Sequence, residues 1–267
     1  MTAQPTAATP RFIASKGSWP LLGFGTVVRK ELTEWTRGPK ALIILGVSVL
    51  GAVFMTLIPF IAEATKEADA AGLLSHDPTA NVLLGWTGQT VALIAVLSTM
   101  ALLSTERDRG TLAWTLTNPV SPASVIAAKF LVAILVFVAA AVVLPMLVSV
   151  GLATVVYGGL PDLQVAGTFL ALFVALPAFY IALTVALGTA VKSTVGVAGV
   201  AFAVMFLPQV LGGLLPIVNE LSPTSIGNWA MLVAKGQPAS MLTPIGWAIS
   251  MIVLVVGAKL VFDRQEL

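Results

Sequence analysis

The sequence of 267 residues contains no cysteine and a single histidine, His76. The chain therefore has no disulfide bond, thiol nucleophile, thiolate metal site or histidine cluster. Zinc, haem and iron–sulfur chemistry are not expected. Charge is also scarce, because only 10% of the residues are charged, against roughly 25% in soluble domains. With 58% hydrophobic residues, the composition is typical of a polytopic membrane protein.

Six long apolar runs each reach the roughly 20 residues that a membrane-crossing helix needs. They predict spans at about residues 41–62, 82–104, 124–156, 166–191, 195–218 and 242–261. The predicted fold class is therefore an all-α membrane protein with six transmembrane helices. Residues 39–267 form the predicted six-span domain.

The distribution of basic residues predicts the orientation of the spans. With a cytoplasmic N-terminus, twelve of the fourteen basic residues lie inside, but only six of the twelve acidic residues do. The positive-inside rule selects this arrangement. We therefore expect a multi-pass protein of the plasma membrane with both termini in the cytoplasm. No nucleic acid is expected as a partner.

Charged residues are missing from the deep parts of the predicted spans. Lys129 and Lys259 lie near cytoplasmic ends, where long side chains can reach the membrane surface. A proton-coupled or ion-coupled carrier normally keeps an intramembrane Asp, Glu or His, at roughly 2.5–3.5 kcal/mol per charge. The energy for transport is therefore expected to come from another source.

The segment before the first span is predicted to have two parts. Residues 1–20 form a disordered cytoplasmic tail, and residues 21–38 form an amphipathic interfacial helix. Its apolar stripe, at helical spacing, consists of Leu21, Phe24, Val28, Leu32 and Trp35. Such a helix serves either as a membrane anchor alone or also as a surface for a cytoplasmic partner.

The longest predicted cytoplasmic loop joins the second and third spans and covers residues 104–123. Thr105 can cap a short helix, with Asp108 three residues later. Leu112 and Leu116 then follow at i,i+4 spacing. On spacing alone, the loop is compatible with an ordinary connector.

The loop and the start of the next span also carry a more specific pattern. It combines an acidic and basic pair, a Gly-Thr-Leu step, a Pro-Val-Ser segment and a lysine in the span. The matching residues are Glu106, Arg107, Gly110, Thr111, Leu112, Leu116, Pro119, Val120, Ser121, Ile126 and Lys129. This pattern resembles the cytoplasmic loop of ABC type 2 transporter permeases. Lys30, Glu31, Leu32 and Arg37 are similar to the helix before the first span in that family.

The resemblance implies that the chain is the transmembrane permease subunit of an ATP-driven ABC exporter. In that family the loop is a coupling helix that contacts a separate ATPase, and the N-terminal helix touches the same subunit. The implied contact residues are Thr105, Glu106, Arg107, Asp108, Arg109, Gly110, Thr111, Leu112, Leu116, Lys30 and Glu31. The implied partners are two ATPase copies, which carry ATP and Mg, and a second permease subunit, identical or homologous. No cofactor is expected on this chain.

The same resemblance implies that the second and fifth spans line the substrate pathway. The candidate lining residues are Trp86, Gln89, Thr90 and Gln209. These groups are equally suited to bonding across helices within one subunit. An uncharged cavity suits an amphipathic or lipid-like cargo.

ATP hydrolysis by the chain itself is not expected, and neither is any other enzyme activity. A phosphate loop has the form GxxxxGK followed by Ser or Thr. The nearest sequence, Lys192-Ser193, has Val191 in the position of the required glycine. Two other functions remain open, namely a secondary carrier and a non-transporting membrane assembly factor.

A short helix is predicted between the last two spans. Ser222 and Pro223 can begin it, and Ile226, Trp229 and Val233 share one face. We expect this helix to lie flat on the outer membrane surface. It is either a cap over the exit of the pathway, as in the resembling family, or an interfacial loop with a Trp anchor.

Overall fold

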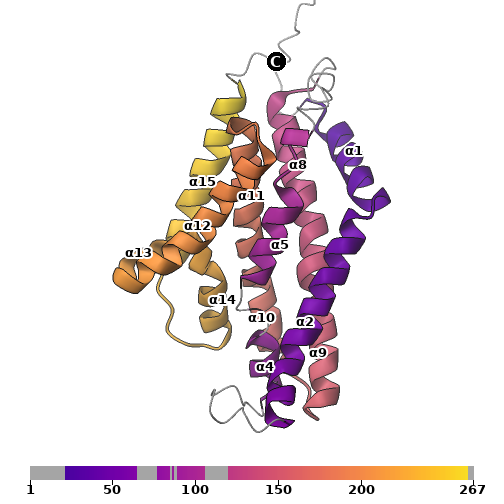
Figure 1. Ribbon diagram of the computed structural model, residues 1–267, viewed down its shortest axis with the longest axis vertical. Coiled ribbons are helices and arrows are strands. Elements are labelled where there is room, and N and C mark those ends of the chain that lie inside the picture. The colour runs from indigo at the N-terminus through magenta and orange to yellow at the C-terminus, as the bar shows by residue number, and fades with distance from the viewer. Residues whose placement is uncertain (1–21, 65–76, 85, 87–88, 106–119, 264–267) are drawn as a thin grey trace, which may run out of the picture.

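The computed structural model describes residues 22–64, 77–84, 86, 89–105 and 120–263, and this part of the chain contains helices and no strands (Figure 1). The helices are α1 (Phe24–Arg37), α2 (Lys40–Ala64), α4 (Pro78–Leu84), α5 (Thr90–Thr99), α8 (Pro122–Phe137), the π-helix η1 (Val138–Val143), α9 (Leu144–Val156), α10 (Leu163–Phe173), α11 (Ala175–Ala190), α12 (Thr194–Leu214), α13 (Pro216–Leu221), the 3-10 helix η2 (Pro223–Ser225), α14 (Ile226–Ala234) and α15 (Leu242–Asp263). The predicted all-α class is confirmed for the described residues.

Five stretches of helix are long and apolar enough to cross a membrane. They are Lys40–Ile61, Ala123–Val156, Leu163–Ala190, Thr194–Leu214 and Leu242–Val261. These stretches match the first, third, fourth, fifth and sixth predicted spans. In the second predicted span, α4 ends at Leu84 and α5 begins at Thr90. Because the ten residues of α5 extend only about 15 Å, six continuous spans stay a prediction.

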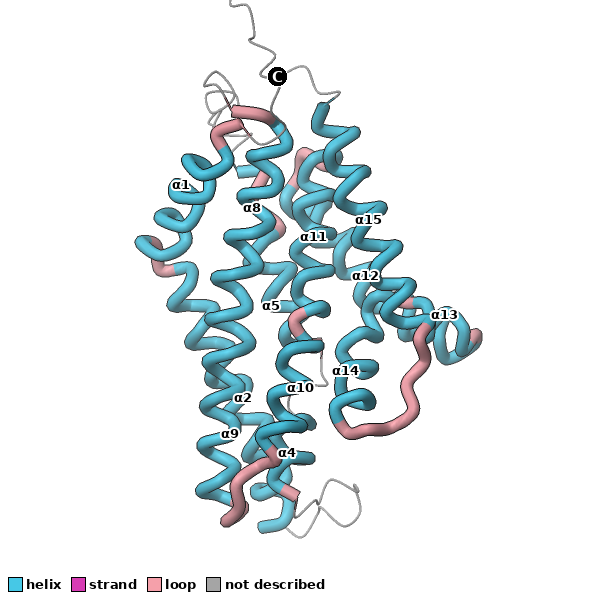
Figure 2. Tube along the Cα trace, turned by 180° about the vertical axis from the view of Figure 1, so that it is seen from behind, coloured by secondary structure: helices cyan, strands magenta, loops and turns pink. Residues whose placement is uncertain are grey.

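The helices run side by side along the long axis of the molecule, with α11 among them, as both views show (Figures 1 and 2). Every residue from Leu176 to Val185 of α11 is buried. Helices α5 and α15 pack against α11, whereas α2 packs against α9 and η1. Helix α1 packs mainly against α8, although α2 follows it directly in the sequence.

The third span is a continuous helix of 34 residues that changes its hydrogen-bonding pattern in the middle. In η1 the Leu144 N–H donates to the Ala139 carbonyl, five residues back, in place of the α-helical four. Pro145 follows at the beginning of α9 and has no N–H to donate. The π-turn thus lies directly before a proline that interrupts the α-helical ladder.

The short helix α14 differs from the prediction that it lies flat on the membrane surface. It packs lengthwise against α10, as Figures 1 and 2 show. A Cβ atom at Gly227 would meet the Phe173 ring at 3.2 Å and Leu176 at 3.3 Å. The missing side chain of Gly227 therefore allows this close packing, while Ile226 and Ala230 are buried on the same helix.

Candidate functional site

Most of the predicted ATPase-contact residues, from Glu106 to Leu116, lie outside the described residues. Thr105, Lys30 and Glu31 are described. The Thr105 N–H donates to the Ala101 carbonyl at 3.2 Å, and its side chain is half-buried. The predicted contacts of the 104–123 loop, which we call the coupling segment, stay a prediction. The structure does define what holds each end of this segment.

The N-terminal end of the coupling segment is held by hydroxyl groups and close packing. The Ser104 and Thr194 hydroxyl oxygens lie 2.7 Å apart and join the segment to the beginning of α12. Leu103 is buried beside α11, where a Cβ at Gly188 would lie 3.1 Å from the Leu103 Cβ. One turn earlier, the Thr99 and Thr184 hydroxyls are 2.7 Å apart. This end is therefore joined to α11 and α12.

The C-terminal end of the coupling segment is held against α1 and α8. The Ser121 N–H donates to the Leu22 carbonyl at 3.1 Å, just before α1 begins. The Ser121 hydroxyl caps α8 by accepting from the Ser124 N–H at 3.1 Å. Two turns into α8, the Lys129 ammonium donates to the Glu31 carboxylate of α1 at 2.8 Å.

The Glu31–Lys129 ion pair corrects the expectation that Lys129 extends to the membrane surface. Both side chains are only 2% exposed. Lys30 is different, because its side chain is 38% exposed and its ammonium lies 3.5 Å from both Glu31 and Glu34. The Glu31 carboxylate therefore faces the inside of the protein, whereas Lys30 remains accessible at the surface of α1.

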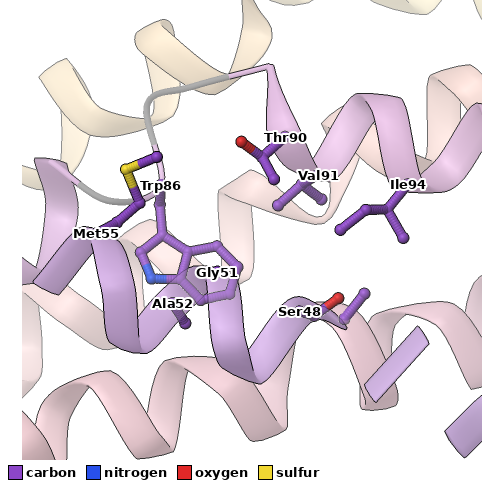
Figure 3. A pocket seen from close by; sticks show the side chains of 9 residues that line it. Ser48, Gly51, Ala52, Met55, Trp86, Thr90, Val91 and Ile94 are labelled. Carbon is purple, nitrogen blue, oxygen red and sulfur yellow. The ribbon is translucent and has the colours of Figure 1, made fainter. Parts of the chain in front are cut away.

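Two of the four predicted pathway residues meet at one pocket, which lies between α2, η1 and the beginning of α5. Trp86 and Thr90 line this pocket together with Ser48, Gly51, Ala52, Met55, Val91, Ile94 and Ala141 (Figure 3). The Trp86 ring is held edge-on by Phe173, with 5.8 Å between the ring centroids. None of these described lining residues is charged. The pocket has a volume of about 20 Å³, enough for a water molecule.

The other two predicted pathway residues do not line this pocket. Gln89 directly precedes the lining residue Thr90 in the sequence, and its side chain is half-buried. Gln209 is exposed on α12, where its side-chain amide donates to the Met205 carbonyl at 3.1 Å. Gln209 therefore bonds within its own helix, and not across helices as the alternative interpretation of these polar groups predicts.

Sequence reasoning missed Ser48, which brings a hydroxyl group into the pocket from α2. Its Oγ atom is buried and has no hydrogen-bond partner among the described residues. A buried hydroxyl without a partner is unfavourable, so the pocket suits a water molecule or a ligand hydroxyl at Ser48. The sequence shows only that Ser48 and Thr56 are polar residues eight positions apart in an apolar helix, and the structure adds that both are buried.

Comparison with known proteins gives one family match. The family model described as "ABC-2 family transporter protein" matches residues 26–267. The match runs from α1 through α15 and includes the coupling segment, the Glu31–Lys129 pair and the pocket beside Trp86. No curated protein matches the chain.

Proposed function

The chain belongs to the ABC-2 transporter family, and on this premise we propose that it is the permease subunit of an ATP-driven exporter. The family match carries the proposal, because it covers the spans and the coupling segment together. The sequence contains no GxxxxGK motif, so the proposal assigns ATP hydrolysis to a separate subunit.

The proposed assembly contains two copies of an ATPase, which bind ATP and Mg, and two permease subunits, identical or homologous. Its orientation in the plasma membrane has both termini of this chain in the cytoplasm. The charge distribution supports this orientation, since it leaves only two of the fourteen basic residues outside.

In the proposed mechanism, ATP binding moves the ATPase against the coupling segment. The Ser104–Thr194 contact transmits the movement to α12. The contact between Ser121 and Leu22 transmits it to α1 and α8. Because the two ends are attached to different helices, a displacement of the segment changes the spacing between those helices.

The uncharged lining of the pocket, rather than its volume of about 20 Å³, supports an amphipathic or lipid-like cargo. Trp86 supplies an aromatic wall, and Ser48 and Thr90 supply hydroxyl groups from α2 and α5 (Figure 3). We assign four residues to the substrate pathway: Trp86, Gln89 and Thr90 at or just before the beginning of α5, and Gln209 on α12. Such a lining can bond a polar group of the cargo without providing an ion-coupling residue.

The decisive experiment measures recovery of an ABC ATPase subunit with the full-length chain. The purified chain alone should hydrolyse no ATP, and the complex should. Leu112→Asp with Leu116→Asp should abolish recovery of the ATPase, because an aspartate would bury charge against an apolar groove. Both the ATPase bound and the rate of ATP hydrolysis are measured at matched membrane levels.

The matched control is Leu160→Asp with Leu163→Asp, which makes the same change at two exposed leucines, one just before α10 and one at its first residue. These leucines lie on the predicted outer side, so the control should recover the ATPase as the wild type does. Equal recovery with the Leu112 and Leu116 variant would mean that the segment is only a connector. Transport without any ATPase would instead favour a secondary carrier.

A further inference from the structure

Helix α1 presents one face to α8 rather than to the membrane. Its buried residues are Val27, Glu31 and Trp35, which are four positions apart and therefore share a face. The charged member, Glu31, meets Lys129 at 2.8 Å. The interfacial helix is thus attached to the third span at the level of this ion pair and again at Leu22.

A buried ion pair is a poor way to gain stability, because both charges lose their hydration. Apolar side chains of similar size would hold two helices together at least as well. An ion pair is, however, more selective than apolar packing for the position of one helix along the other. If α1 slid along α8, the Lys129 ammonium and the Glu31 carboxylate would separate and their 2.8 Å contact would be lost, while Glu31 would keep only the longer contact to Lys30 at 3.5 Å. The short contact forms in one position of α1 along α8.

We propose that Glu31 and Lys129 are positioning residues that fix α1 to α8 in one register, so that both helices move as one body with the C-terminal end of the coupling segment. The N-terminal end moves instead with α11 and α12, through Leu103 and Ser104. This inference rests on the proposed function, because it takes the ATPase as the source of the movement. It assigns the interfacial helix a mechanical role in addition to membrane anchoring.

The first experiment uses the chain alone and measures the distance between spin labels. Because the chain has no native cysteine, labels are placed uniquely at cysteines replacing Thr36 on α1 and Val155 on α9, both exposed. The wild type should give one narrow distance distribution. Glu31→Gln should lose it, and the charge reversal Glu31→Lys with Lys129→Glu should restore it.

Glu34→Gln is the matched control for this experiment. It removes the same charge from the same helix, but the Glu34 side chain is 56% exposed and pairs with Lys30 at the surface. The distribution should stay narrow in this variant. If Glu31→Gln also keeps the narrow distribution, the ion pair does not position α1 and the proposal is wrong.

Two further variants apply if Glu31→Gln fails to accumulate, since neither leaves a lone buried charge. The charge reversal should give the narrow distribution. Glu31→Leu with Lys129→Met should fold and keep α1 packed, but with a broad distribution, because apolar packing allows several registers. A narrow distribution in this apolar variant would overturn the positioning role of the charges.

The second experiment adds the ATPase and a non-hydrolysable ATP analogue. The distance from Thr36 to Val155 should not change, whereas the distance from Thr36 to Lys192, an exposed residue between α11 and α12, should shift. The shift should be lost in the apolar variant and restored by the charge reversal, at equal ATPase recovery. Equal shifts of both distances in the wild type would overturn movement as one body. If no ATPase binds, the proposed function fails, and the distances in the chain alone still decide whether the ion pair positions α1.

Discussion

The two ends of the coupling segment are held by different chemistry. At the N-terminal end, the Thr99 and Thr184 hydroxyl oxygens lie 2.7 Å apart, and each also lies within hydrogen-bond distance of a carbonyl of its own helix, so one hydroxyl donates to the other and the second donates to a carbonyl. If the helices part, each hydroxyl keeps a partner. At the C-terminal end, separation of Glu31 from Lys129 leaves two buried charges. The first end can therefore separate and re-form at little cost, while the second holds its helices together.

Removal of one charge from the C-terminal end should have the largest effect. Glu31→Ala leaves the Lys129 ammonium buried without its carboxylate and should lower the free energy of unfolding by about 3–5 kcal/mol. Glu34→Ala removes a surface carboxylate from the same helix and should cost at most about 1 kcal/mol. Unfolding in detergent, followed by circular dichroism, measures both variants. Equal effects would remove the contrast between the two ends.

Added volume at the N-terminal end should have an intermediate effect. Gly188→Ala places a methyl group against Leu103 and should cost about 1–3 kcal/mol of unfolding free energy. Gly199→Ala is the matched control, because a Cβ at that glycine of α12 meets nothing within 4 Å. The control should be neutral or should stabilise by up to about 1 kcal/mol. The same unfolding assay compares the pair, and a neutral Gly188→Ala would show that α11 and Leu103 are not closely packed.

Removal of the hydroxyls at the N-terminal end should have the smallest effect. Ser104→Ala and Thr194→Val should each change the unfolding free energy little, with a coupling energy near 0.6 kcal/mol, roughly the average for membrane hydrogen bonds. A double-mutant cycle on the four chains measures this energy. A coupling energy as large as the loss from Glu31→Ala would mean that both ends are held equally firmly.

Local patterns in the sequence were sufficient for the long helices but not for their partners. Hydrophobic length alone identified five stretches that the structure also has as helices able to span a membrane. The second span was predicted as continuous because a hydropathy average passes over the interval between Leu84 and Thr90. A hydropathy average over a stretch of sequence does not show where one helix ends and the next begins.

The face of α1 shows most clearly what the sequence alone could not reveal. The predicted apolar stripe contained Leu32, which is 44% exposed, and omitted Val27 and Glu31, which are buried. Glu31 is buried because its partner, Lys129, comes from 98 residues further along the chain. No pattern within one helix records such a partner. The burial of the Ser48 hydroxyl could not be predicted for the same reason, because the residues around it come from α5 and η1 as well as from α2.

The π-turn η1 divides the third span into two helices, α8 and α9, whose buried faces point in different directions around the helix axis. Each residue of an α-helix advances by about 100° around the axis, so the extra residue held in a π-turn rotates all that follows by a similar angle. Before the turn, the buried face carries Lys129 toward α1. After it, the face with Ser149 and Ala153 is buried, and α9 packs against α2. Deletion of one alanine from η1 would restore α-helical hydrogen bonding through the span. It would also rotate one half of the span, so that one of these two faces would turn away from its neighbouring helix.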